Sequence, residues 1–162
     1  MARWLRATTP IAPRSRATGD SSRSSPTPLT CRGSSPPDSQ QFLRDTKAGT
    51  LILISRSNNA GQPANGSALY GQPSFDGRFV TFQASATNLP GGSAEYTQAY
   101  VRDRERQRTL LLSRAADGEP GNDTSSDVAI SGDGHWASFD GNPTNLGGNP
   151  AYYSVFRAGP IP

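Results

Sequence analysis

Short apolar and aromatic runs, separated by turn residues, recur along most of this 162-residue chain. Glycine and proline interrupt it at short intervals, and no apolar pattern at helical spacing lasts long enough to indicate a helix. The aromatic and β-branched run 79–82 directly follows Asp76-Gly77, a pair that favours a tight hairpin turn. We therefore predict an all-β chain, with strands at residues 41–45, 50–56, 69–75, 79–84, 98–104, 108–115, 126–131, 135–139 and 151–157.

Two of these strands contain apolar runs without alternation, at residues 51–54 and 110–112. A half-buried strand alternates apolar and polar residues, whereas a short continuous apolar run suits a strand that is covered on both faces. We therefore expect sheets that are packed between neighbouring sheets.

The chain also repeats itself with a period of 57 to 58 residues. Matches that keep their mutual spacing over a whole unit indicate a repeat architecture, in which each unit buries its apolar faces against its neighbours. The clearest matches join residues 44–45 to 102–103 and residues 87–89 to 144–146, and residues 155–157 are interpreted as a further copy of residues 100–102.

Residues 72–82 and 100–103 carry a resemblance to a known family. They resemble the repeat of TolB-like, WD-like β-propeller proteins of bacteria, which reads Pro-Ser-x-Ser-x-Asp-Gly-Arg-x-aliphatic-x-Phe, then a Thr-Asn-Leu loop, then apolar-Val-Arg-Asp. The resemblance covers residues 42–159 and implies an incomplete β-propeller of antiparallel four-stranded blades.

In blade terms the resemblance implies a propeller domain at residues 41–159. It would hold a partial blade at 41–56, a full blade at 69–115 and a partial blade at 126–157. Known propellers close a ring of four or more blades, so nine strands supply only part of one. The resemblance also implies a periplasmic or extracellular location, although residues 1–18 show no recognisable secretory signal.

Residues 1–40 are rich in serine, threonine, proline and arginine, and we expect them to form a disordered tail. The chain has a formal net charge of +3. Its basic excess belongs to this tail, so the charge gives no evidence for a nucleic-acid-binding face. The only cysteine, Cys31, lies there too and can form no internal disulfide. No stretch approaches the length of a transmembrane helix, and no membrane insertion is expected.

Few side chains are candidates for chemistry. His135, the only histidine, is expected at a solvated strand edge. Asp76 and Asp133 occupy equivalent repeat positions, and are therefore interpreted as turn formers rather than as paired acid–base carboxylates. The Gly-Gly pairs at 91–92 and 147–148 lack the lysine and the following helix of a phosphate-binding loop. No Gly-x-Ser-x-Gly elbow suggests a serine hydrolase.

Arg102 and Asp103, like Arg44 and Asp45, are expected to end strands and to satisfy the turn backbone or each other. The loops after the two Thr-Asn-Leu segments hold one glutamate or none. Calcium takes six to eight oxygen ligands with several carboxylates, so these loops are poor calcium sites.

Asn65 and Asn122 match the glycosylation sequon but are interpreted as turn residues. Trp136 takes the repeat position of Phe79. We therefore expect Trp136 in the core rather than on a ligand-stacking surface.

These observations favour a non-catalytic β-propeller fragment that binds protein or serves a structural role, since stacked blades present loops and rims as interaction surfaces. No catalytic, cofactor-binding or metal-binding residue is predicted, and no cofactor. The expected partner is another protein or a second copy, held through uncovered blade faces. Two alternatives stay open: an accessory propeller domain of a hydrolase whose catalytic domain lies elsewhere, and a non-functional gene remnant.

Overall fold

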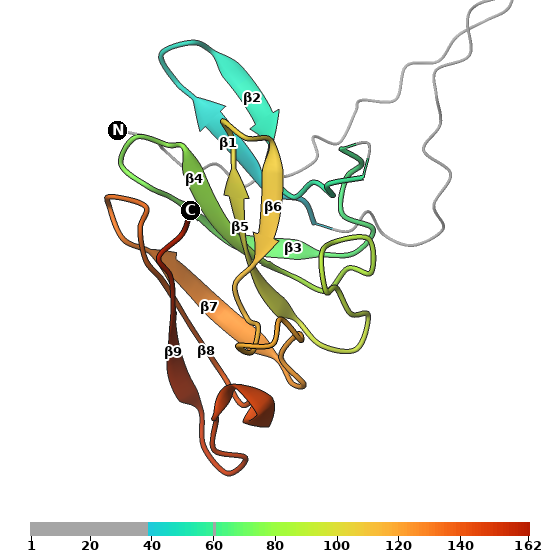
Figure 1. Cartoon of the computed structure of the whole chain (residues 1–162). Coiled ribbons are helices and arrows are strands. Elements are labelled where there is room, and N and C mark those ends of the chain that lie inside the picture. Colours follow the sequence, from blue (N-terminus) through green and yellow to red (C-terminus); the bar gives the residue numbers. More distant parts are fainter. Residues whose placement is uncertain (1–38, 60) are drawn as a thin grey trace, which may run out of the picture.

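The computed structural model describes residues 39–59 and 61–162, so the tail expected at 1–40 lies almost wholly outside the described residues. The described part is all-β, as predicted, with antiparallel sheets and one 3₁₀ turn (Figure 1). Its elements are β1 (Phe42–Asp45), β2 (Thr50–Leu53), β3 (Ala68–Pro73), β4 (Phe79–Ala84), β5 (Gln98–Asp103), β6 (Arg108–Leu111), β7 (Ser125–Ile130), β8 (Ala137–Gly141), the 3₁₀ turn η1 (Thr144–Leu146) and β9 (Ser154–Ala158).

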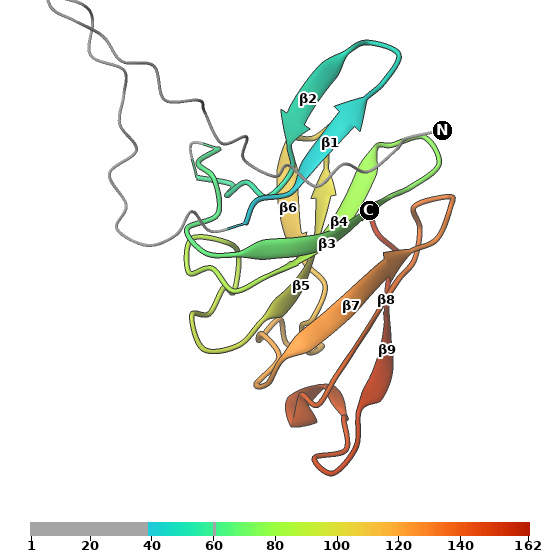
Figure 2. The same cartoon turned by 180° about the vertical axis from the view of Figure 1, so that it is seen from behind.

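The strands form three sheets in chain order. The first sheet is β1-β2, the central sheet is β3-β4-β5-β6 and the last sheet is β7-β8-β9. Figures 1 and 2 show the central sheet lying between the other two. The described strands do not close into a ring.

Two strands end three or more residues earlier than predicted. β2 ends at Leu53 and β6 at Leu111, instead of at residues 56 and 115. After β2 the backbone N–H of Arg56 donates to the carbonyl of Ile54 at 2.7 Å, and an equivalent bond turns the chain after β6. Ile54 is itself fully buried. Its N–H still donates to the carbonyl of Gln41 at 2.8 Å. The apolar pattern thus runs one residue beyond the end of the strand, and it cannot locate that end.

The central sheet separates two apolar cores, because alternate residues of a strand face opposite sides. In β4, Val80 and Phe82 point into the first core and Phe79 points into the second, so this continuous apolar run is covered on both faces. The first core contains Leu43, Ile54, Ala64, Ala68, Val80, Phe82, Ala84, Ala86, Leu89, Tyr100 and Leu111. The second core contains Phe79, Ala99, Val101, Leu112, Val128, Ala137, Phe139 and Ile161.

The sequence repeat is visible in the hydrogen bonds that tie the loops down. The side-chain amide of Asn65 donates to the hydroxyl of Thr87 at 2.7 Å, and that of Asn122 donates to the hydroxyl of Thr144 at 2.9 Å. The backbone N–H of each asparagine is bound in turn by the next loop's Asn88 or Asn145, in both cases at 3.0 Å. The prediction that both sequon asparagines serve loop structure is confirmed.

The last sheet corrects one predicted repeat match. Phe82 pairs with Tyr100 across β4 and β5, and Phe139 pairs with Phe156 across β8 and β9. Both ring pairs are stacked, with centroids 5.4 and 5.2 Å apart. Phe156 is therefore the counterpart of Tyr100, and the match of residues 155–157 to 100–102 is wrong by one residue. A shift of one residue moves every side chain of a strand to the other face.

Polar side chains fasten the central sheet to its neighbours. From the loop after β2, the amide of Asn58 donates to the carbonyl of Thr109 at 2.8 Å and accepts the N–H of Thr109 at 2.7 Å. On the other side, the side chains of Gln83 and Gln72 accept backbone N–H groups of β7 at 2.9 and 3.2 Å. Asn58 also covers part of the outer edge of β6, which would otherwise offer unpaired backbone groups.

Candidate interaction surfaces

The aspartates of the two Asp-Gly turns bind their own backbone. Asp76 accepts the hydroxyl of Ser74 at 2.6 Å and the N–H of Arg78 at 2.9 Å, and Asp133 makes the equivalent bonds at 2.6 and 3.0 Å. These bonds hold the pKa of both carboxyl groups below the ordinary value. Both residues are turn formers, as predicted.

Residue 135 follows the second of these turns. Gly134 has a φ of 75°, a left-handed conformation that glycine adopts without steric cost. His135 is exposed, as predicted. Within residues 39–59 and 61–162, no three His, Cys, Asp or Glu side chains lie close enough together to hold a metal ion.

Asp103 is a buried carboxylate whose charged partner is Arg78 rather than its sequence neighbour Arg102. The guanidinium of Arg78 donates to both oxygens of Asp103, at 2.9 and 3.3 Å. The backbone N–H groups of Glu105 and Arg106 donate to the same carboxylate at 3.0 and 3.1 Å. Burial alone raises the pKa of Asp103, but the bonds from Arg78 and Arg106 outweigh it and hold that pKa below its ordinary value.

A sequence signal for this ion pair exists in the next repeat. There, His135 and Gly159 occupy the positions of Arg78 and Asp103 once the strand register is corrected. Both charged partners are thus lost together, which is what a paired interaction predicts. The signal was hidden by the one-residue error in the match of β9 to β5.

Arg102 points towards the first sheet and is buried without a carboxylate partner among the described residues. Its guanidinium donates to the hydroxyl of Thr109 at 3.1 Å and to the side chain of Gln107 at 3.2 Å. Burial lowers the pKa of Arg102, and the nearby charge of Arg56 lowers it further. Arg102 therefore serves the packing of two sheets and offers no free charge.

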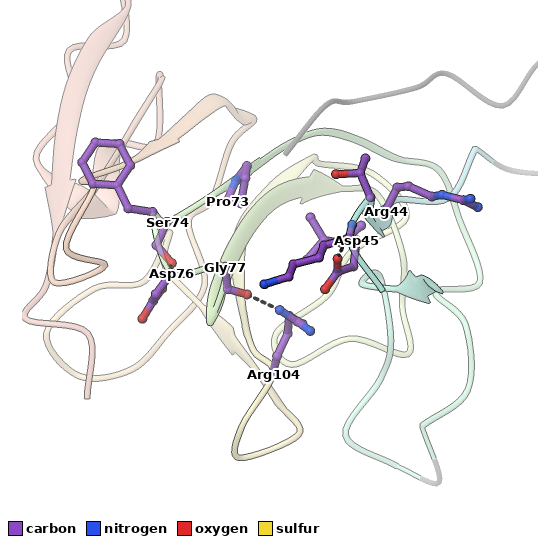
Figure 3. A pocket seen from close by; sticks show the side chains of 11 residues that line it. Arg44, Asp45, Pro73, Ser74, Asp76, Gly77 and Arg104 are labelled. Atoms are coloured by element: carbon purple, nitrogen blue, oxygen red, sulfur yellow. Dashed lines mark hydrogen bonds between the residues drawn. The ribbon is translucent and has the colours of Figure 1, made fainter. Parts of the chain in front are cut away.

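A groove of about 230 Å³ lies between the β1–β2 turn and the β3–β4 turn. Figure 3 shows Arg104 directed towards Gly77 and Asp45, and Arg44 directed away from them. Asp45 accepts the N–H groups of Lys47 and Ala48 at 2.9 and 2.8 Å, which lower its pKa. The carboxylate is thus engaged in the turn that ends β1, as predicted. The groove is also smaller than the pockets of about 300 to 1,000 Å³ that hold small ligands.

The side of the first sheet that points away from the central sheet forms the N-terminal face, which we define as Phe42, Arg44, Leu51 and Leu53. The β1–β2 register places Leu43 opposite Ile52, facing the first core, and therefore turns these four side chains the other way. Phe42 is 39% and Leu51 57% exposed. Leu51, within the apolar run 51–54, is therefore left largely uncovered by the described residues.

The same repeat positions in the central sheet are enclosed. Tyr100 and Thr109, the counterparts of Phe42 and Leu51, are each 0% exposed, because the first sheet covers them. Leu51 is more apolar than the threonine at its counterpart position. The N-terminal face thus has the composition of a buried face, but no sheet among the described residues packs on it.

The opposite end of the stack exposes the C-terminal face, which we define as Trp136, Ser138, Val155 and Arg157. Trp136 is 37% exposed, so the expectation that it lies in the core is wrong. Its counterpart Phe79 is buried because the last sheet packs on it, and no described sheet packs on Trp136. Instead, the guanidinium of Arg157 lies over the indole, 4.3 Å from the ring centroid.

Comparison with known proteins found no relative of this chain. No protein-family model, no curated protein and no solved structure matches the chain. In the part of the chain that the structure describes, no helix is long and apolar enough to cross a membrane.

Proposed function

We propose that this chain is a non-catalytic stack of β-propeller-type blades that acts by binding protein through its blade faces. In this proposal the first sheet is the closing half of a blade, the central sheet is a complete blade and the last sheet supplies three strands of another. The sequence resemblance to TolB-like repeats and the order of the three sheets support this reading.

The N-terminal face is the observation that carries the proposal. It presents Phe42 and Leu51, 39% and 57% exposed, at positions that are fully buried in the next repeat. An exposed apolar sheet face of this kind marks a contact surface. The turn carboxylates support the non-catalytic part of the proposal, because Asp45, Asp76 and Asp103 all accept hydrogen bonds from their own turns.

Completing the first blade tests this proposal. A copy of residues 67–97 is inserted directly before Gln40 of the full chain, so that Thr97 of the copy takes the place of Ser39. The two positions are equivalent, because the carbonyl of Ser39 accepts the N–H of Ala68 and that of Thr97 accepts the N–H of Ser125. The inserted β4 would then pair with β1 and place its Phe82 against Phe42.

We expect the insertion to raise the free energy of unfolding by at least about 1 kcal/mol, the contribution of one aromatic pair. We also expect slower amide hydrogen exchange in β1. The matched control carries Thr81→Pro in the inserted copy only, because proline removes a ladder donor in the middle of the new strand. Unchanged stability and exchange in the insertion variant would overturn the blade assignment.

A further inference from the structure

We propose that copies of this chain stack head to tail, with the N-terminal face of one copy packed against the C-terminal face of the next. This inference rests on the proposed function, because it treats each sheet as a blade. It goes further by naming the partner as a second copy of the chain. Four large apolar side chains would be covered: Phe42, Leu51, Trp136 and Val155.

The interface we propose repeats two interfaces that exist inside the chain. In both, the side of the earlier sheet that corresponds to the Phe79 side of the central sheet packs on the side of the later sheet that corresponds to the Tyr100 side. The first core joins the first sheet to the Tyr100 side of the central sheet, and the second core joins the Phe79 side of the central sheet to the last sheet.

The N-terminal and C-terminal faces correspond to the two sides that meet in these internal interfaces. The N-terminal face carries Phe42 at the position of Tyr100, and the C-terminal face carries Trp136 at the position of Phe79. The corrected register also places Val155, 81% exposed, at the position of buried Ala99. Each free face therefore matches the other, and neither matches itself.

This complementarity favours a head-to-tail contact over a symmetric one. A contact between two N-terminal faces would place Phe42 against Phe42, an arrangement that neither internal interface contains. A head-to-tail contact is heterologous, so it continues from copy to copy until a ring closes or a filament forms.

Two single-face variants of the full chain test the direction of stacking. Leu51→Glu places a charge on the N-terminal face and Val155→Glu places one on the C-terminal face. Both positions are exposed, so the fold tolerates the change. Ala116→Glu is the matched control, since Ala116 is exposed in a loop that belongs to neither face. Sedimentation velocity at about 1 to 500 µM covers weak and moderate affinities.

We expect the unchanged chain and Ala116→Glu to associate, and each face variant alone to be monomeric. An equal mixture of the two variants should form dimers only, because the intact C-terminal face of one meets the intact N-terminal face of the other. In a Trp4→Phe background, the emission of Trp136 should shift to shorter wavelength as the unchanged chain associates, because the indole leaves water.

Three results would overturn head-to-tail stacking: a monomeric unchanged chain throughout this range, association of either face variant alone, or a mixture that stays monomeric. None of these bears on the insertion experiment. A completed blade that stabilises a monomeric chain would retain the blade assignment and reject the second copy as partner.

Discussion

The central sheet and the two sheets beside it are built from the same repeat, yet among residues 39–59 and 61–162 only the central sheet is enclosed on both faces. Tyr100 is 0% exposed and its counterpart Phe42 is 39% exposed, while Phe79 is 6% exposed and its counterpart Trp136 is 37% exposed. In each pair the residue types are both aromatic, so the side chain itself does not explain the difference. Burial here is decided by whether a neighbouring sheet is present.

The largest expected effect of this difference is on the two stacked phenylalanines. Phe82 is 0% exposed within the first core, so Phe82→Ala should lower the free energy of unfolding by about 3 to 5 kcal/mol. Phe139→Ala should cost less, because its stacking partner Phe156 is only half-buried in a sheet with one covered side. Denaturant titration of the two variants measures both losses, and equal losses would contradict the distinction between enclosed and flanking sheets.

A smaller and opposite effect is expected at Tyr100. Its hydroxyl is buried without a hydrogen-bond partner among the described residues, and burial raises its pKa. Phenylalanine occupies the counterpart position in both flanking sheets, as Phe42 and Phe156. Because an unpaired buried hydroxyl costs about 1 to 3 kcal/mol, Tyr100→Phe should leave the chain as stable or about 1 kcal/mol more stable in urea titration. A clear loss of stability would mean that the hydroxyl is bound in solution.

The smallest effect concerns the ion pair between Arg78 and Asp103, which has no equivalent in the other two described sheets. Asp103 has a lowered pKa when folded, so its contribution to stability is present above its ordinary value of 3.8 and is lost as the pH falls through the folded value. Arg78→Gln removes the main charged partner. The acid-unfolding midpoint, followed by circular dichroism, should therefore move to higher pH.

The matched control for this change is His135→Gln. His135 occupies the position of Arg78 in the last repeat, where Gly159 replaces the aspartate and the nearby carboxylate is the exposed Asp133, so its substitution should move the acid-unfolding midpoint less than Arg78→Gln does. A midpoint that moves equally in both variants would show that Asp103 does not depend on Arg78.

Much of the strand pattern follows from local chemistry and was predictable. The bounds of β4 were predicted at 79–84, as found, because an Asp-Gly turn precedes the strand and an uncharged polar loop follows it. β2 and β6 were predicted too long, because buried Ile54 and Leu112 extend the apolar runs beyond the last residue of each strand. The match of β9 to β5 was predicted one residue out, because Arg157 was aligned with Arg102, whereas the stack of Phe156 on Phe139 places Phe156 at the position of Tyr100.

The sequence by itself determined the class of structure, the turns and the repeat, since Asp-Gly turns and short apolar runs act over a few residues. Only the tertiary structure decided which side of each sheet is covered, that Arg78 is the partner of Asp103, and that Trp136 lies at an open end. These outcomes depend on contacts between segments that lie far apart in the chain, such as those of Arg78 and Asp103, which are 25 positions apart. Equivalent positions in a repeat have similar local sequence. Their burial therefore differs because the units have different neighbours in the fold.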